Sequence, residues 1–298
     1  MRLCHCLAIA ACALAWGAAC NPGVEMRDGG PETSDGGGRD RPAGSDWSGG
    51  WDLALRDGAP GQDSAVVGTL TPGSSTLQLS VAGSMREVLL VVPNEVLSNQ
   101  RPLVIALHGN GDTPGNFLAS TGLASAAAAR GVILAAPQGI AQTFPYGNQT
   151  LTDIDWDAYR TEDEGNIDLP LIDAVYRHLI GTSSVSLGKV HLFGYSQGGY
   201  LAFRGAMEKA SSLAAAVVVA AANPLPGSSL VADAARPIPI ALTIGENDYA
   251  ISLARQTRTE LENAGHEVRY EEIAGAGHVP FPGDAAALLD WLLAHSLY

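Results

Sequence analysis

The chain has 298 residues, of which 46% are hydrophobic and 16% charged, so it contains enough apolar material for a sizeable core. Its formal net charge of −14 argues against binding to nucleic-acid phosphates or to an anionic membrane surface. All four cysteines lie within the first twenty residues, which excludes a disulfide framework or a thiolate metal site later in the chain.

The N-terminal segment has the three parts of a secretory signal. Arg2 supplies a positive charge, residues 7–16 form a short apolar run, and small residues precede Cys20. The run is shorter than the roughly 20 residues of a membrane-spanning helix. A cysteine behind small residues resembles the lipobox of bacterial lipoproteins. We therefore expect residues 1–20 to be a lipoprotein-type signal peptide with Cys20 acylated, and ordinary signal cleavage is the alternative.

This segment predicts a secreted protein of the bacterial cell envelope that meets the membrane only through its lipid anchor. Residues 21–63 are rich in Gly, Asp, Ser and Pro and show no helical or strand periodicity. Such a stretch buries too little apolar surface to offset the entropy lost on ordering, so we expect a disordered linker. A single folded domain is expected over residues 64–298.

Short alternating runs open this domain and predict antiparallel strands over residues 65–71, 76–81 and 86–93. A buried strand is expected at 102–107, followed by one helix that begins with the cap Thr113 and Pro114 and continues through Arg130. Another strand is expected at 132–136, and a long polar loop follows it.

The rest of the chain alternates between strand and helix patterns. Strands are expected at 189–193, 214–221, 238–244 and 267–273, and helices at 167–180, 197–209, 252–264 and 284–296. This alternation predicts an α/β fold with a mainly parallel central sheet and helices on both faces. In such folds ligands bind beyond the carboxyl ends of the strands, so catalytic residues should follow strands directly.

The sequence around Ser196 has the form of a nucleophile elbow. A predicted strand leads into Gly-x-Ser-x-Gly at residues 194–198, and a predicted helix follows. The turn is so tight that Gly194 and Gly198 must lack side chains, and it raises the serine hydroxyl above the sheet edge. Ser196 is therefore the candidate nucleophile.

A serine nucleophile needs a base and a group that orients the base. His278 follows a predicted strand within a glycine-rich loop, whereas the other histidines lie in the signal, within predicted elements, before a strand or in a loop they help to shape. Asp248 follows another strand and lies between Ser196 and His278 in sequence, the order expected for this elbow. We expect Asp248 to be the acid and keep Glu246 as the alternative.

The loop after the strand at 102–107 reads His-Gly-Asn-Gly-Asp over residues 108–112. Its backbone can approach a reacting carbonyl closely because of its glycines. We expect the backbone amides of Asn110 and Gln197 to form an oxyanion hole, and an ordinary loop is the alternative.

Residues 153–164 carry carboxylates at positions 1, 3, 5 and 12 of a calcium-binding EF-hand loop. Ala158 replaces the glycine required at position 6, and flanking helices are not evident. We therefore expect a solvated acidic loop near the mouth of the site, with no metal bound. Trp156 and Tyr159 are candidates for lining the substrate pocket, with core packing as the alternative.

Four segments together resemble α/β-hydrolase serine esterases over roughly residues 80–298: 107–112, 194–199, 245–248 and 277–278. The Gly-x-Gly-His loop and the spacing after Trp156 are similar to the polyhydroxybutyrate depolymerase and feruloyl esterase branch. That branch comprises secreted enzymes that cleave ester bonds in polymers or plant phenolics. The first two segments are similar to the phospholipase/carboxylesterase and acyl-thioesterase branch.

The motifs and the resemblance predict a serine hydrolase that cleaves carboxylic esters through an acyl-enzyme. Its substrates would be small-molecule or polymeric esters, including polyester or feruloyl-type esters, and no cofactor is implied. The alternatives are a phospholipase/carboxylesterase or thioesterase-like enzyme, an acyltransferase in which an alcohol replaces water, and a non-catalytic surface-binding module.

Overall fold

The computed structural model describes residues 69–94, 100–146, 149–182, 184–280 and 285–298. The predicted signal peptide, Cys20 and the predicted linker lie outside the described residues, as does most of the strand expected at 65–71. None of the helices in the described ranges is long and apolar enough to cross a membrane.

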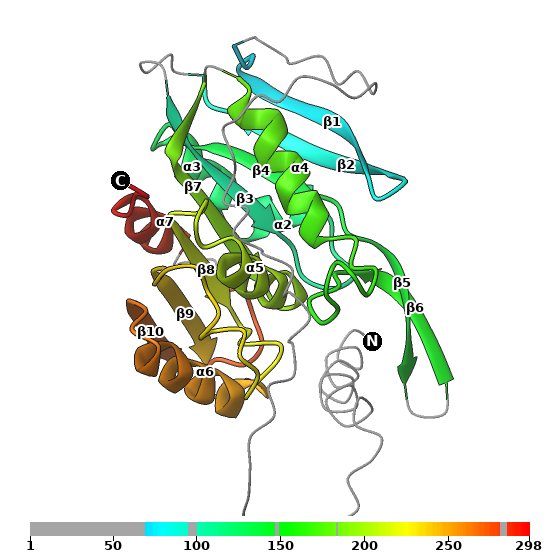
Figure 1. Cartoon of the computed structure of the whole chain (residues 1–298). Helices are drawn as coiled ribbons and strands as arrows, with labels where there is room; N and C mark the ends of the chain where they lie inside the picture. The colour runs from blue at the N-terminus through cyan, green and yellow to red at the C-terminus, as the bar shows by residue number, and fades with distance from the viewer. Residues whose placement is uncertain (1–68, 95–99, 147–148, 183, 281–284) are drawn as a thin grey trace, which may run out of the picture. The chain divides into compact units, whose positions relative to one another are not determined.

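An eight-stranded sheet lies at the centre of the fold, in the order β1-β2-β4-β3-β7-β8-β9-β10 (Figure 1). Strands β1 (Gly73–Val81) and β2 (Ser84–Val92) pair antiparallel, β2 joins β4 antiparallel, and all later neighbours are parallel. The other strands are β3 (Arg101–Leu107), β4 (Ile133–Pro137), β7 (Val185–Tyr195), β8 (Ala215–Val219), β9 (Ile240–Gly245) and β10 (Val268–Ile273). The predicted α/β class with a mainly parallel sheet is confirmed.

Helices cover both faces of the sheet, which explains why a central strand such as β8 is apolar and buried at every position. Helices α4, α5 and α6 lie on one face, and α2, α3 and α7 lie on the other (Figure 1). The helices are α2 (Pro114–Ser120), α3 (Leu123–Ala128), α4 (Leu169–Ile180), α5 (Gln197–Glu208), α6 (Ile251–Asn263) and α7 (Ala285–Leu293).

The single helix expected from Pro114 to Arg130 is wrong, because the structure contains two short helices there. The predicted cap is present, since the Thr113 hydroxyl accepts the Asn116 N–H at 3.3 Å. The break lies at Gly122, whose φ of 70° is left-handed and cannot continue a right-handed helix. The chain turns there so that both helices can pack their apolar sides onto the sheet.

The long polar loop expected after β4 is also wrong in part. Strands β5 (Ile140–Tyr146) and β6 (Gln149–Asp155) form an antiparallel two-stranded ribbon that extends away from the main sheet (Figure 1). The Thr143 and Thr152 hydroxyls hydrogen-bond across it at 2.8 Å. A Gly-Asn pair between threonine-containing runs is a sequence signal for such a hairpin. The ribbon matters for function because its base contacts the loop after β3.

Candidate active site

The turn between β7 and α5 holds Ser196 in a strained backbone conformation, with φ 54° and ψ −124°. The strain is maintained by close packing, because a Cβ on Gly194 would lie 2.1 Å from the Gly198 carbonyl oxygen. A Cβ on Gly198 would lie 2.3 Å from the Leu107 carbonyl oxygen, at the end of β3. The Ser196 amide also donates to the Val219 carbonyl at 2.9 Å. Sterics therefore hold the serine at the carboxyl edge of the sheet.

Three side chains from three strand ends form one hydrogen-bonded chain. Ser196 Oγ lies 2.8 Å from His278 Nε2, and His278 Nδ1 lies 2.8 Å from Asp248 Oδ2. The Asp248 side chain is fully buried, and its other oxygen accepts the Ala250 N–H at 2.9 Å. A carboxylate facing Nδ1 places the proton of a neutral imidazole there, which leaves Nε2 as an acceptor for the serine proton.

Backbone contact between two loops brings the acid to the base. A Cβ on Gly245 would lie 2.4 Å from the Gly277 carbonyl oxygen, and the Asn247 N–H donates to Ala276 at 2.8 Å. The alternative acid, Glu246, is exposed and accepts the Gly275 N–H at 2.9 Å instead. Asp248 is therefore the carboxylate that contacts His278.

The loop after β3 lies against the serine. A Cβ on Gly109 would lie 2.9 Å from the Tyr195 ring and 3.4 Å from Ser196 Cβ. The next residue is Asn110, and the residue after the serine is Gln197. In the part of the chain that the structure describes, neither the Asn110 nor the Gln197 backbone N–H has a hydrogen-bond acceptor. Two unpaired amides on either side of a serine can stabilise an oxyanion.

Buried His108 fixes the position of this loop. Its Nε2 accepts the Gly139 N–H at 3.0 Å, so its proton lies on Nδ1 and is donated to the Gly109 carbonyl at 2.7 Å. Burial lowers the pKa of His108, which keeps the ring neutral and suits it to this role. The expected role of His108 in shaping the loop agrees with these contacts.

The base of the β5–β6 ribbon supports the same loop. The Asn110 side chain donates to the Ile154 carbonyl at 3.3 Å and also hydrogen-bonds to the Asp155 carboxyl. Burial raises the pKa of Asp155 to about 7, although its carboxylate accepts the Trp156 N–H at 2.8 Å. An ionisable group therefore lies directly behind a residue predicted to form the oxyanion hole. The sequence pattern did not reveal this role of Asp155.

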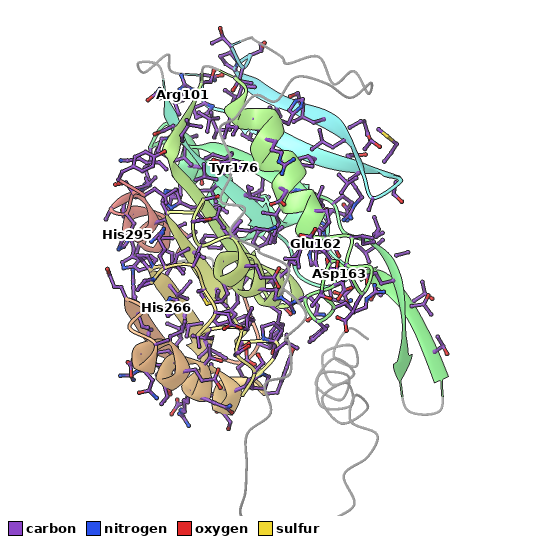
Figure 2. The ribbon with its side chains drawn as sticks, viewed as in Figure 1. Arg101, Glu162, Asp163, Tyr176, His266 and His295 are labelled. Carbon is purple, nitrogen blue, oxygen red and sulfur yellow. The ribbon has the colours of Figure 1, made fainter. Side chains whose placement is uncertain are left out.

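The expectation of a solvated acidic loop over residues 153–164 is wrong for its first half. Asp155 ends strand β6 and is buried, and buried Asp157 accepts the Arg160 N–H at 3.1 Å and pairs with its guanidinium at 2.6 Å. Its second half is largely exposed, and Figure 2 shows Glu162 and Asp163 there. Among the described residues, no group of three His, Cys, Asp or Glu side chains is arranged to hold a metal ion.

The two predicted pocket residues differ in their surroundings. Trp156 is 1% exposed, and its indole N–H donates to the His108 carbonyl at 2.8 Å, so burial favours the packing alternative. Tyr159 is half-buried, and its hydroxyl donates to Gln197 Oε1 at 3.3 Å. Tyr159 therefore lies beside the candidate oxyanion hole, and its contact with substrate stays a prediction.

Tyr249, which lies outside the predicted motifs, packs its ring against His278. Its ring stacks on His278 with centroids 4.6 Å apart and an interplanar angle of 28°, and its hydroxyl lies 3.5 Å from His278 Nε2. The only sequence signal for Tyr249 was its place directly after Asp248.

His266, by contrast, lies away from the site. It accepts a hydrogen bond from the Ile238 N–H, before β9, and this agrees with the prediction from its position before a strand (Figure 2).

Comparison with known proteins agrees with this geometry. Residues 91–292 match the model of the phospholipase/carboxylesterase family. The chain is 31% identical over 152 residues to the protein named putative esterase NocK, from Nocardia uniformis subsp. tsuyamanensis. That match covers 51% of this chain and 41% of NocK, so the chain spans less than half of the curated relative.

Solved structures share the fold at low identity. A ferulic acid esterase superposes with a TM-score of 0.57 at 14% identity, covering 76% of this chain and 100% of that one. An S-formylglutathione hydrolase from Staphylococcus aureus superposes with a TM-score of 0.59 at 14% identity, covering 74% and 98%. The family match spans more than half of the sequence, and the chain therefore belongs to the phospholipase/carboxylesterase family of α/β-hydrolase esterases.

Proposed function

We propose that this protein is a serine hydrolase that cleaves carboxylic esters through an acyl-enzyme formed on Ser196. The observation that carries the proposal is the hydrogen-bonded chain from Ser196 through His278 to Asp248, with both distances at 2.8 Å. Membership of the phospholipase/carboxylesterase family supports the same reaction class. A binding module without catalysis would have no need to maintain a strained serine next to a buried acid–base pair.

In this mechanism His278 Nε2 takes the proton of Ser196 as the hydroxyl oxygen attacks the ester carbonyl. The Asn110 and Gln197 amides stabilise the negative oxygen of the tetrahedral adduct, and Asp248 stabilises the imidazolium. His278 then protonates the leaving-group oxygen as the C–O bond breaks, which releases the alcohol. Water repeats the sequence on the acyl-enzyme and releases the acid.

The substrates that we propose are small-molecule or polymeric carboxylic esters, including feruloyl and polyester bonds. The fold shared with a ferulic acid esterase supports this choice. A thioesterase-type substrate is a second candidate, because the fold is also shared with an S-formylglutathione hydrolase. An acyltransferase would use the same triad with an alcohol in place of water, and product analysis with added alcohols separates the two reactions.

We further propose, from sequence alone, that residues 1–20 direct secretion, that Cys20 is acylated, and that residues 21–63 tether the catalytic domain of residues 64–298 to the envelope. In bacterial cells the full chain should fractionate with membranes, and Cys20→Ala should move it to the soluble fraction. Membrane association that survives Cys20→Ala would contradict the lipid anchor.

The esterase activity is tested with the full chain on 4-nitrophenyl acetate, butyrate and octanoate. Ser196→Ala should lower kcat/KM by roughly 10³-fold or more, because the acyl-enzyme cannot form. Ser80→Ala, an exposed change on edge strand β1, is the matched control and should leave kcat/KM unaltered. Equal, negligible rates in wild type and Ser196→Ala would contradict the proposal and favour the binding module.

A further inference from the structure

Tyr249 lies where the reaction has to move a proton, although none of the motifs includes it. Its hydroxyl is 3.5 Å from His278 Nε2 and also hydrogen-bonds to Ser196. Tyr249 is 37% exposed, whereas Ser196 is 3% exposed. Tyr249 therefore forms the solvent-facing side of the serine–histidine pair, which an incoming ester must contact.

The strand order places Tyr249 opposite the candidate oxyanion hole. Ser196 directly follows β7, which lies between β3 on one side and β8 and β9 on the other. Asn110 follows β3, whereas Tyr249 follows β9. A carbonyl oxygen bound by the Asn110 and Gln197 amides points toward the β3 side. The leaving-group oxygen must instead approach His278 Nε2, and so it comes near the Tyr249 hydroxyl.

We propose that Tyr249 is a further catalytic residue whose hydroxyl binds the leaving-group oxygen of the ester while His278 protonates it. This inference rests on the proposed esterase function and adds a leaving-group subsite to it. As the tetrahedral adduct collapses, the bond from carbon to the leaving oxygen breaks and the proton moves from Nε2 to that oxygen. The Tyr249 O–H donates a hydrogen bond to the same oxygen and keeps its own proton.

Two features of Tyr249 suit this role. Burial of its hydroxyl end, with the negative charge of Asp248 nearby, raises the pKa of Tyr249 above its ordinary value, so the group remains a proton-bearing donor at neutral pH. Its ring stacks on His278 at 4.6 Å, an arrangement in which an aromatic face stabilises the imidazolium that forms during attack. The ring also limits rotation of the imidazole away from Ser196.

The test compares two butyrate esters that form the same butyryl-enzyme and differ only in the leaving group. 4-Nitrophenoxide leaves as a stable anion, whereas ethoxide needs a proton and a hydrogen-bond donor. For Tyr249→Phe, which keeps the stacked ring, the ratio of kcat/KM for 4-nitrophenyl butyrate to that for ethyl butyrate should rise about tenfold, the effect of one hydrogen bond made in the transition state. Tyr270→Phe removes a hydroxyl that binds Glu272 on β10, and it should leave the ratio unaltered.

A ratio within twofold of wild type in Tyr249→Phe would overturn the inference, whether both rates fall together or neither falls. A tenfold rise would support it, because a general loss of folding lowers both rates equally. Ser196→Ala is measured on both esters alongside. Activity that persists in Ser196→Ala would contradict the proposed function itself, whereas an inactive Ser196→Ala with an unaltered Tyr249→Phe ratio would overturn only the leaving-group role.

Discussion

The two sides of the candidate site are held in place by different interactions, backbone packing on one side and buried polar contacts on the other. The elbow, residues 194–198, is held by glycine contacts in which backbone atoms fill the space where a Cβ would lie. The loop after β3 instead hydrogen-bonds to Asp155, one member of a buried cluster that we call the polar support and define as Arg86, Asp155, Asp157 and Asp168. There, Asp168 binds Arg86 at 2.7 Å and accepts the Asp157 N–H at 2.7 Å. Steric support is indifferent to pH, whereas the polar support contains buried groups that titrate.

The largest expected effect comes from breaking the buried ion pair of the polar support. Arg86 and Asp168 are both buried, at 1% and 0% side-chain exposure. Arg86→Met should lower the free energy of unfolding by roughly 3–5 kcal/mol, because it leaves the Asp168 carboxylate without its partner. Urea denaturation measures this. Arg130→Met removes the exposed pair with Asp290 and should cost less than about 1 kcal/mol; an equal loss in both variants would contradict the argument from burial.

Breaking the elbow should have the next largest effect on stability. Gly198→Ala places a methyl group 2.3 Å from the Leu107 carbonyl oxygen. Neither backbone segment can move away without a large loss of stability, because the contact is between backbone and Cβ and not with a flexible side chain. The variant should lose about 3 kcal/mol of unfolding free energy together with most esterase activity. Gly205→Ala in the same helix meets only side-chain ends, at 2.9 Å from Ile172 Cδ1, and should lose less. Similar losses in the two variants would contradict the steric argument, because they would show that any glycine-to-alanine change in this helix has the same effect.

The titration of Asp155 distinguishes the two kinds of support. Its folded-state pKa of about 7 exceeds the ordinary value of 3.8, so the stability it contributes is full below about pH 4 and is lost as the pH rises through about 7. Asp155→Asn cannot titrate, so the variant does not lose stability in this way as the pH rises. The unfolding free energy of the variant minus that of wild type should therefore increase between pH 4 and pH 8, by on the order of 1–3 kcal/mol. Denaturation at each pH measures the difference, and a constant difference would contradict the raised pKa.

The smallest expected change concerns the Asn110 side chain, which ties the loop to Ile154 and Asp155. Asn110→Ala keeps the backbone amide but removes the side-chain hydrogen bonds that hold this amide in position. We therefore expect kcat/KM to fall about tenfold, while the free energy of unfolding changes by less than about 1 kcal/mol. Thr113→Ala, three residues after Asn110, removes the side-chain cap of α2. It should show the reverse pattern, with a loss of about 1 kcal/mol of unfolding free energy and little change in kcat/KM. Loss of stability without loss of rate in Asn110→Ala would contradict a positioning role.

Local signals account for the parts of the fold that the sequence predicted well. The run Gly-x-Ser-x-Gly between a strand and a helix predicted the elbow because only glycine permits that backbone approach. Apolar runs such as β8 predicted buried parallel strands. The helix break at Gly122 was not predicted, because the effect of a single glycine within a helical pattern depends on what the helix packs against. The β5–β6 ribbon was not predicted either, because its Gly-Asn turn signal lies between polar, threonine-containing runs that resemble a loop.

The sequence by itself determined the α/β class, the strands that end at the site, and the candidate nucleophile Ser196 and base His278, because these follow from periodicity and from local backbone chemistry. Only the tertiary structure decided that Asp248 rather than Glu246 contacts His278, that Trp156 is buried, and that Asp155 lies behind Asn110. It also placed Tyr249 over His278. These contacts join residues far apart in the chain or depend on which way a side chain points, and neither property is encoded in a local pattern.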